Sequence, residues 1–265
     1  MLKKELIIVK VGGNVIDSEE NLFSFLKKFH SIKGHKILVH GGGKLATDLS
    51  NMLGIEAKMV DGKRITDAET LKVVVMVYSG INKTITTELN AFGTEATGIC
   101  GANMNLLPAK KREKGNIDYG FVGDILLDKI SSTEWQKILE QDICPVVAPL
   151  TADAKGQLLN TNADTIASSI AQALSQLYSV RLIYCFEKDG VLKDPNDNSS
   201  LIEHITPAEY LNLKSEGIIS KGMIPKLDNA WEALRSGVDK VLIGNALYIE
   251  ELTTSEHKTG TLLSL

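Results

Sequence analysis

Leu6-Ile7-Ile8-Val9-Lys10-Val11-Gly12-Gly13 is an apolar run of strand length that carries one lysine and ends in two glycines. Further along, Ile37-Leu38-Val39-His40 ends in Gly41-Gly42-Gly43. Glycine has no Cβ, so the backbone N–H groups of such loops can converge on an anion, and a helix start behind the loop adds the positive end of its dipole. The two loops together predict a site that holds negative charge in two places.

Lys10 stands out because the rest of its strand is apolar. A lysine there could snorkel from a sheet edge, with its stem buried and its ammonium in water. Alternatively, the sheet could hold the cation and aim it at the glycines that follow. We favour the second interpretation, because Lys10 directly precedes glycines that are suited to an anion.

The composition is that of an ordinary globular chain of 265 residues, with 43% hydrophobic and 23% charged residues. The net charge of −4 does not favour nucleic acid or an anionic membrane as a partner, so any anion binding must be built locally. No apolar run is long enough to cross a bilayer, and Lys10 with its glycines interrupts any signal-peptide core. We therefore expect a cytoplasmic protein.

The cysteines and histidines show no pattern that would hold a bridge or a metal. Cys100, Cys144 and Cys185 are odd in number and far apart, which favours free thiols in a reducing compartment. The five histidines lack the spacing of metal ligands. The sequence therefore predicts neither a disulfide nor a structural metal site.

Strand-like and helix-like segments alternate along the chain, which predicts an α/β fold with helices on both faces of a parallel or mixed sheet. Asp17 is expected to be the N-cap of the first long helix, and Thr206-Pro207-Ala208-Glu209 is a clear helix start. The closing segment, 259–263, is expected to form an edge strand. We expect the boundary between an N-terminal lobe and a C-terminal lobe to lie at the helix over 163–177.

The glycine loops differ from the two most common nucleotide-binding loops. A Walker loop needs Ser or Thr after its Gly-Lys pair, whereas Gly43-Lys44 is followed by Leu45. A dinucleotide fingerprint needs the spacing G-x-G-x-x-G, which neither loop supplies. Both folds, and with them a dinucleotide-dependent oxidoreductase, are therefore disfavoured.

Three further polar residues allow two interpretations each. Asp164 follows Asn160 and Asn162 at a helix start, where three capping groups exceed what one cap needs. Lys226 is in the first turn of the last long helix, where the dipole disfavours a cation, so it is either solvated or paired with an anion. Arg64 could clamp a carboxylate or lie on the surface, and the sequence leaves both open.

The charged segment 110–115 is flanked by short runs that predict a β-hairpin. Its lysines, arginine and glutamate, closed by Gly115, are typical of a hairpin tip. The tip could contact a phosphate, but such a charge run is more often a solvated loop, and we favour that interpretation.

Five motifs occur in order and together resemble the amino acid kinase family: Lys10-Val11-Gly12-Gly13, His40-Gly41-Gly42-Gly43, Gly62-Lys63-Arg64-Ile65-Thr66, Asn160-Thr161-Asn162-Ala163-Asp164 and Gly222-Met223-Ile224-Pro225-Lys226. The last three are more specific to the acylglutamate enzymes of that family. The resemblance covers nearly the whole chain and implies one domain over 1–265, a three-layer α/β/α sandwich around a mostly parallel, eight-stranded sheet. An N-terminal lobe, about 1–175, would bind the acylglutamate and form the dimer. A C-terminal lobe, about 176–265, would bind ATP.

The resemblance also implies roles for single residues. Lys10 and Lys226 would stabilise the transferring phosphoryl group, and Asp164 would hold both lysines. The acylglutamate would be bound by Gly42, Gly43, Arg64 and Asn160. The nucleotide would be bound by Gly12, Gly13, Glu187, Lys188, Asp189, Gly190, Val191, Leu192, Ile218, Ile219 and Ser220. The expected cofactor is ATP, with Mg²⁺ carried on the nucleotide and none held by the protein.

The implied reaction is phosphorylation of the side-chain carboxylate of an N-acylated glutamate, by default N-acetyl-L-glutamate, in the second step of arginine biosynthesis. That carboxylate is ionised at neutral pH, so the transfer needs positioning and charge neutralisation rather than a general base. The alternatives are a larger acyl group such as succinyl, another acceptor (carbamate, glutamate, aspartate or uridylate), or a non-catalytic small-molecule sensor. A sensor is disfavoured because it needs no transition-state cations.

Two segments depart from the pattern of the family. Many relatives carry a lysine and an aspartate where this chain has Gly101-Ala102-Asn103-Met104-Asn105, and a first aspartate with a smaller second residue where it has Glu187-Lys188-Asp189. The second departure affects contacts with the nucleotide. The chain also begins close to its first strand, without the extra N-terminal helix of hexameric, arginine-inhibited relatives, so we expect a plain homodimer without strong arginine feedback.

Overall fold

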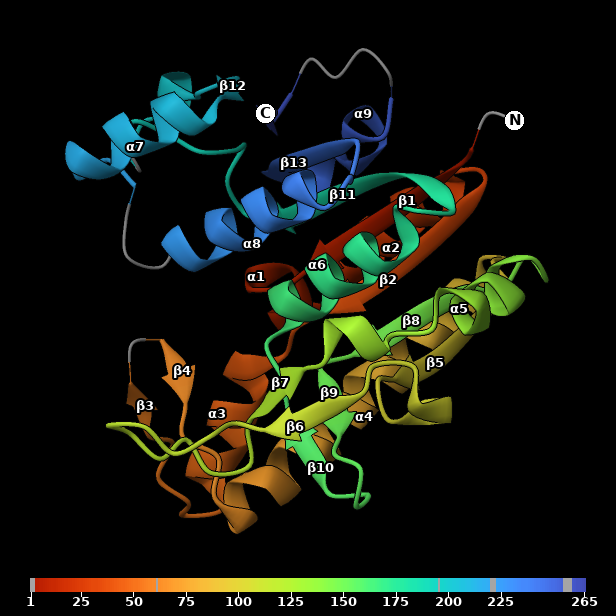
Figure 1. The fold of residues 1–265 in the computed structure, drawn as a ribbon, viewed down its shortest axis with the longest axis vertical. Coiled ribbons are helices and arrows are strands. Elements are labelled where there is room, and N and C mark those ends of the chain that lie inside the picture. The colour runs from red at the N-terminus through yellow and green to blue at the C-terminus, as the bar shows by residue number, and fades with distance from the viewer. Residues whose placement is uncertain (1–2, 61, 195, 220–222, 255–258) are drawn as a thin grey trace.

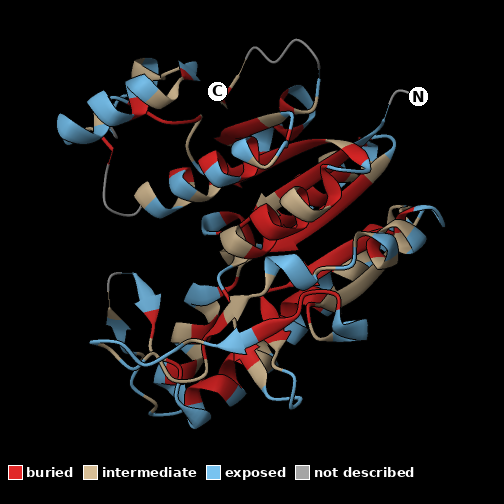
Figure 2. Ribbon diagram, in the orientation of Figure 1, coloured by how far each residue is buried: buried red, intermediate tan, exposed pale blue. Residues whose placement is uncertain are grey.

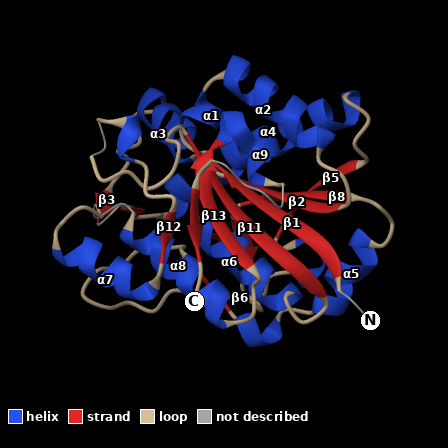
Figure 3. Ribbon diagram, turned by 90° about the horizontal axis from the view of Figure 1, so that it is seen from above, coloured by secondary structure: helices blue, strands red, loops and turns tan. Residues whose placement is uncertain are grey.

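The computed structural model describes residues 3–60, 62–194, 196–219, 223–254 and 259–265. Its central sheet contains β1 (Lys4–Val11), β2 (His35–His40), β5 (Ala96–Cys100), β8 (Cys144–Ala148), β11 (Tyr178–Phe186), β12 (His204–Ile205), β13 (Lys240–Asn245) and β14 (Thr261–Leu263). These eight strands lie in the order β12-β14-β13-β11-β1-β2-β8-β5. Figure 3 shows the sheet as a twisted fan between two layers of helices, which confirms the predicted three-layer α/β fold.

The strands from β13 to β5 all run parallel to their neighbours. Parallel sheets are covered on both faces, and the strands are accordingly buried along most of their length (Figure 2). The prediction of an edge strand at the end of the chain is wrong. β14 pairs with β13 on one side and with β12 on the other, and the buried side chains of Thr261 and Leu263 suit this interior place.

Alternate residues of β1 enter two different cores. Leu6 and Ile8 pack with one layer of helices, and Ile7 and Val9 pack with the other. The first layer consists of α5 (Ser132–Leu139), α6 (Ala163–Leu174), α7 (Pro207–Ser215) and α8 (Ile224–Arg235). The second consists of α1 (Asn14–Asp17), α2 (Glu19–Ser31), α4 (Ala68–Ala91) and α9 (Ile249–Leu252), and α3 (Gly43–Met52) packs on α4.

Small antiparallel pairs extend from the half of the molecule that holds β5 and β8 (Figure 1). They are β3 (Met59–Val60) with β4 (Lys63–Arg64), β6 (Ala109–Lys111) with β7 (Gly123–Ile125), and β9 (Leu150–Ala152) with β10 (Leu158–Asn160). The β6–β7 pair confirms the predicted hairpin. Its charges pair within the hairpin, as Lys110 does with Glu113 at 2.7 Å, which agrees with a solvated loop.

Side-chain caps fix where the helices begin. Thr206 and Glu209 form the predicted capping box of α7, with Pro207 in its first turn. The prediction for the first long helix is wrong by one residue. The N-cap of α2 is Ser18, whose Oγ accepts from the N–H of Asn21, because Asp17 already ends the short helix α1.

The three cysteines are free thiols, as predicted. Cys144 and Cys185 are buried, and burial raises the pKa of each thiol to about 12. Both therefore stay protonated at neutral pH and act as small apolar side chains of the core.

Lys36 is a charged residue inside the core, only 8% exposed, at the start of β2. Its Nζ donates to the carbonyl oxygens of Phe29 at 3.0 Å, His30 at 2.8 Å and Ile32 at 2.7 Å. These carbonyls lie at the end of α2, where the last carbonyls lack their usual helical donors, although Phe29 also accepts from the N–H of Ile32 at 3.3 Å. Burial lowers the pKa of Lys36, but its ammonium is saturated by acceptors, so Lys36 caps the helix from a neighbouring strand.

Replacing Lys36 by methionine keeps an apolar stem and removes the donor from three carbonyls. We expect Lys36→Met to lower the free energy of unfolding by about 2–3 kcal/mol, since each buried acceptor left unpaired costs about 1–3 kcal/mol and water can recover part of that. Urea denaturation followed by circular dichroism measures the change. The control is Lys33→Met, an exposed lysine between the same two elements; equal stability of the two variants would contradict the capping role.

Candidate active site

Lys10 lies at the centre of the candidate site because its position on β1 places its side chain on the face of the sheet that α6 and α8 cover. Leu6 and Ile8 face the layer with α6 and α8, and the two-residue period of a strand places Lys10 on that face as well. β1 is paired on both sides, and the Lys10 side chain is 12% exposed. The interpretation of Lys10 as a lysine at a sheet edge is therefore wrong.

Asp164 reaches the same point from the first turn of α6. The N-cap of α6 is Asn162, whose Oδ1 accepts from the N–H groups of Asp164 at 2.8 Å and Thr165 at 3.1 Å. The Asp164 carboxylate is thus not needed as the cap. Its Oδ1 is 2.8 Å from Nζ of Lys10, and its Oδ2 is 3.8 Å from Nζ of Lys226.

Lys226 enters the site from the first turn of α8. Its side chain is 15% exposed, and its Nζ also lies 5.3 Å from the ring centre of Phe186 and 5.9 Å from that of Tyr184. Of the two interpretations of this lysine, the structure supports pairing with an anion. One carboxylate therefore faces two lysines that come from different elements of the fold.

The electrostatics of this group follow from burial and from the three charges. Burial would raise the pKa of Asp164, but attraction by Lys10 and Lys226 outweighs it, and the pKa lies below its ordinary value. Burial lowers the pKa of Lys226, with Asp164 opposing the shift and Lys10 adding to it. Asp164 is therefore ionised at neutral pH and balances only one of two positive charges.

The two glycine loops lie side by side at the ends of β1 and β2. The N–H of Gly41 donates to the carbonyl of Val11 at 2.8 Å, and a Cβ on Gly41 would stand 3.4 Å from Cα of Gly12. A Cβ on Gly42, whose φ is 144°, would stand 2.5 Å from Cδ1 of Ile81. Gly42 is the N-cap of α3, and among the described residues no side chain caps the N-terminus of that helix. Its N–H groups remain available for an anion.

Arg64 lies against the second glycine loop and is 8% exposed, so its interpretation as a surface residue is wrong. Its Nη2 donates to the carbonyl of Gly43 and to Oγ1 of Thr47, both at 2.7 Å. Its Nη1 is buried and has no hydrogen-bond partner in the described part of the chain. Asn160 donates from Nδ2 to Oγ1 of Thr66 at 3.0 Å, which brings the end of β10 to the segment that follows Arg64 and β4.

The loop after β11 lies beside the first glycine loop. Oε2 of Glu187 is 3.2 Å from the point that a Cβ would occupy on Gly13. Oδ1 of Asp189 accepts from Nδ2 of Asn245, at the end of β13, at 2.9 Å. A Cβ on Gly12 would stand 2.9 Å from Nζ of Lys10, so a side chain there would displace the ammonium.

The other residues predicted to bind nucleotide differ in how accessible they are. The N–H of Val191 donates to Oγ1 of Thr261 at 2.8 Å, and Gly190 packs against the same threonine. The residues with buried side chains are Val191, Leu192 and Ile219. Lys188 and Ile218 are half-buried, and Ser220 lies outside the described residues. Nucleotide binding by this set stays a prediction.

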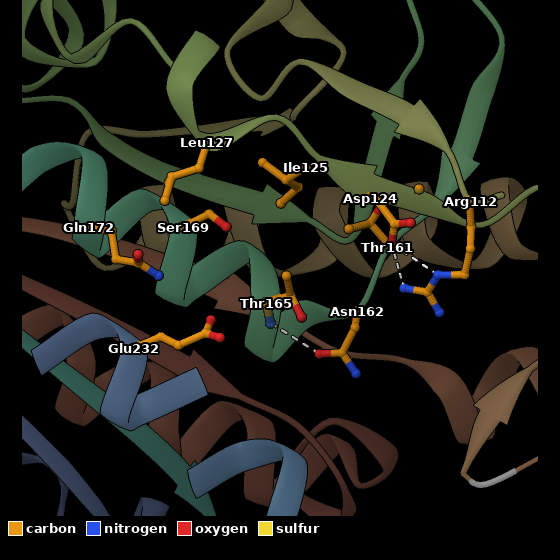
Figure 4. A pocket seen from close by; sticks show the side chains of 11 residues that line it. Arg112, Asp124, Ile125, Leu127, Thr161, Asn162, Thr165, Ser169, Gln172 and Glu232 are labelled. Atoms are coloured by element: carbon orange, nitrogen blue, oxygen red, sulfur yellow. Dashed lines mark hydrogen bonds and ion pairs between the residues drawn. The ribbon is translucent and has the colours of Figure 1, made fainter. Parts of the chain in front are cut away.

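A cavity of about 250 Å³ runs along the outer side of α6 (Figure 4). It is lined by Arg112, Gly123, Asp124, Ile125, Leu127, Thr161, Asn162, Thr165, Ser169, Gln172 and Glu232. Nη2 of Arg112 lies 2.6 Å from Oδ1 of Asp124, so the two charges neutralise each other. The lining contains none of the three residues at the centre of the candidate site. Sequence reasoning missed this cavity because its residues come from separate segments that share no motif.

Two further observations concern the part of the chain that the structure describes. No group of three or more His, Cys, Asp and Glu side chains in that part of the chain is arranged to hold a metal ion. No helix there combines the length and the apolar character needed to cross a membrane.

Comparison with known proteins gives consistent matches. A model of the amino acid kinase family matches residues 5–245. The chain is 53% identical to an acetylglutamate kinase of Cytophaga hutchinsonii over 262 residues, which are 98% of each chain. It is 51% identical to an acetylglutamate kinase of Phocaeicola vulgatus over 251 residues, 94% of this chain and 97% of that one. A solved structure from Streptococcus mutans superposes with a TM-score of 0.78 at 27% identity, over 98% of both chains.

Removing the charge of Asp164 should leave two neighbouring ammonium groups without a counter-ion. We expect Asp164→Asn to lower the free energy of unfolding by about 3 kcal/mol at neutral pH, the usual cost of breaking a buried ion pair. Because folding lowers the pKa of Asp164, its stabilisation is complete above the ordinary value of 3.8 and is lost as the pH falls through the folded pKa. The gap between the two proteins should therefore close below pH 3.8.

Urea denaturation at a series of pH values measures this gap. The control is the double variant Asp164→Asn with Lys226→Met, in which only one cation remains. We expect it to recover part of the lost stability at neutral pH. A double variant that is no more stable than Asp164→Asn would show that repulsion between the lysines is not the cause.

Proposed function

The chain belongs to the amino acid kinase family, and we propose that it transfers the γ-phosphoryl group of ATP to the side-chain carboxylate of N-acetyl-L-glutamate, in arginine biosynthesis. The observation that carries this proposal is the identity of 46–53% to relatives named acetylglutamate kinase, over nearly the full length of the chain. The product would be N-acetylglutamyl 5-phosphate.

Phosphoryl transfer to a carboxylate joins two anions, so the main task of the protein is to offset negative charge. The net positive charge of the Lys10, Asp164 and Lys226 group supports this role. Lys10 and Lys226 would bind the oxygens of the transferring group from two sides. Asp164 would hold both ammonium groups in place. Mg²⁺ bound to the phosphates of ATP would share in neutralising the charge.

The acylglutamate would bind at the second glycine loop. Nη1 of Arg64 supports this assignment, because a buried guanidinium nitrogen without a partner needs an acceptor, and a ligand carboxylate would supply one. The N–H groups of Gly42 and Gly43 at the start of α3 would bind a second anionic group. Asn160, which is hydrogen-bonded to Thr66 close to Arg64 in the chain, would donate or accept a further hydrogen bond.

ATP would bind along the C-terminal lobe, about residues 176–265. The loop with Glu187 and Asp189 lies against Gly13, which supports a nucleotide that runs from this loop toward Lys10. The N-terminal lobe, about 1–175, would hold the acylglutamate. The reaction would then take place between the lobes, where Lys10 and Asp164 meet Lys226. A cytoplasmic location and the lack of a nucleic-acid partner belong to the same proposal, which the net charge of −4 supports.

The homodimer is also proposed, and one edge of the sheet supports it. β5 ends the sheet on the side of the N-terminal lobe, its residues are half-buried, and among the described strands it pairs only with β8. A second copy could cover such an edge. Light scattering should give twice the 28.8 kDa of one chain. The mass of a single chain, or that of a hexamer, would contradict a plain homodimer.

An assay of acyl-phosphate formation tests the activity and the acyl group together. The purified protein is given ATP and Mg²⁺ with N-acetylglutamate, N-succinylglutamate, glutamate or aspartate, and the product is trapped as the hydroxamate. We expect turnover with N-acetylglutamate, and a fall in kcat of about 100-fold or more in Lys10→Ala and in Lys226→Ala, because each removes a cation that faces the developing charge.

Exposed Lys33→Ala serves as the control for loss of a positive charge as such. Preference for N-succinylglutamate would assign the larger acyl group. Absence of turnover with all four acceptors would reject the proposed function and favour another acceptor or a non-catalytic sensor.

A further inference from the structure

His40 ends β2 immediately before the second glycine loop and is fully buried. Its Nδ1 is 2.7 Å from the carbonyl oxygen of Gly41, and its Nε2 is 3.2 Å from Nδ2 of Asn82. An amide nitrogen donates, so Nε2 must be the acceptor of that pair and Nδ1 must carry the ring proton. His40 therefore donates from Nδ1 to Gly41. Burial lowers the pKa of His40 to about 4, so the ring is neutral at neutral pH.

The orientation of the Asn82 amide, on which this tautomer depends, is fixed by its other neighbours. Nδ2 of Asn82 also donates to the carbonyl of Val146 at 2.9 Å, and a carbonyl can only accept. A flipped amide would place two oxygens in contact. Asn82 belongs to α4, so this helix sets the tautomer of His40 by a direct contact with its ring.

The hydrogen bond from His40 to the carbonyl of Gly41 also fixes the direction of the N–H of Gly42. The carbonyl of Gly41 and the N–H of Gly42 belong to one planar trans peptide, in which they point in opposite directions. Fixing the carbonyl toward His40 fixes the N–H of Gly42 away from it. The N–H of Gly41 belongs to the preceding peptide and donates to the carbonyl of Val11, so the chain is also held just before the Gly41–Gly42 peptide. No described residue accepts a hydrogen bond from the N–H of Gly42.

We propose that His40 is a positioning residue: its Nδ1–H, held in register by Asn82, orients the Gly41–Gly42 peptide so that the N–H of Gly42 is presented to the anionic acceptor substrate. This inference rests on the proposed function, which assigns Gly42 to the acylglutamate. His40 touches no reacting atom and takes no part in proton transfer. Its neutral, buried ring supplies a fixed donor without adding a charge to the site.

Two substitutions of His40 distinguish the role of Nδ1 from the role of Nε2. Asparagine places an amide nitrogen near the position of Nδ1, so His40→Asn can still donate to Gly41. Glutamine reaches the position of Nε2, so His40→Gln keeps a partner for Asn82 but has no donor for Gly41. We expect kcat/KM for N-acetylglutamate to be about tenfold higher in H40N than in H40Q, since misplacement of a binding group is costly. The KM for ATP should be nearly the same in both.

Thermal melts of both variants separate positioning from folding. A merely structural role would lower the activity of both variants in step with their loss of stability, or would raise both KM values together, and either result would overturn the proposal. So would equal kcat/KM in H40N and H40Q.

A second measurement does not depend on turnover. In protein labelled with ¹⁵N-histidine, the ring nitrogens of His40, assigned by their loss in H40N, should show a proton on Nδ1 and none on Nε2. A proton on Nε2 would overturn the positioning role even if the enzyme is active. If the wild-type protein turns over none of the acceptors, the proposed function fails, and the tautomer still tests the geometry of the loop.

Discussion

The contact of Asp164 with Lys10 and Lys226 is the constraint on which the rest of the site depends. It joins a central strand and the first turns of two helices, which are far apart in the sequence, at one point. Three partly buried charges of this kind add little to stability as such, because the cost of taking them out of water offsets their attraction. What they provide is a fixed arrangement in which one positive charge is left over, and in the proposed reaction that surplus would offset the charge of the phosphoryl group in transfer.

The parallel sheet brings the two glycine loops and the loop with Glu187 to the same edge as Lys10. β1, β2 and β11 run in the same direction, so their carboxyl ends open on one edge, where ligands of open α/β sheets bind. The two glycine loops and the loop with Glu187 follow directly from these ends. Gly42 and Gly12 show why side chains are excluded there: a Cβ on Gly42, whose φ is 144°, would stand 2.5 Å from Cδ1 of Ile81, and a Cβ on Gly12 would stand 2.9 Å from Nζ of Lys10. The absence of side chains thus serves both the packing of the loops and the access of an anion.

The residues of the site were predictable where the chemistry is local. Lys10 in an apolar strand, Asp164 among surplus capping groups and Lys226 at a positive helix end each conflict with their surroundings, and such conflicts are expected at functional sites. Arg64 stayed open because its burial depends on the packing of α3, which no local pattern reveals. The tautomer of His40 could not be foreseen either, since Asn82 is 42 residues away. For the fold, alternation predicted the layers, while the interior place of β14 depends on β12, a strand of two residues too short to be recognised.

Comparison of Lys36 with Lys226 shows how a structural lysine differs from one that is proposed to bind substrate. Burial lowers the pKa of both. The ammonium of Lys36 has three donors and three carbonyl acceptors within 3.0 Å, so it has no capacity for a ligand. Nζ of Lys226 is 3.8 Å from its carboxylate, beyond hydrogen-bond distance, and otherwise faces aromatic rings. A cation that is partly desolvated and incompletely paired gains most from a new anion, and Lys226 meets that condition whereas Lys36 does not. The two lysines therefore differ in whether their ammonium groups have donors left for a ligand. Burial, which they share, does not distinguish them.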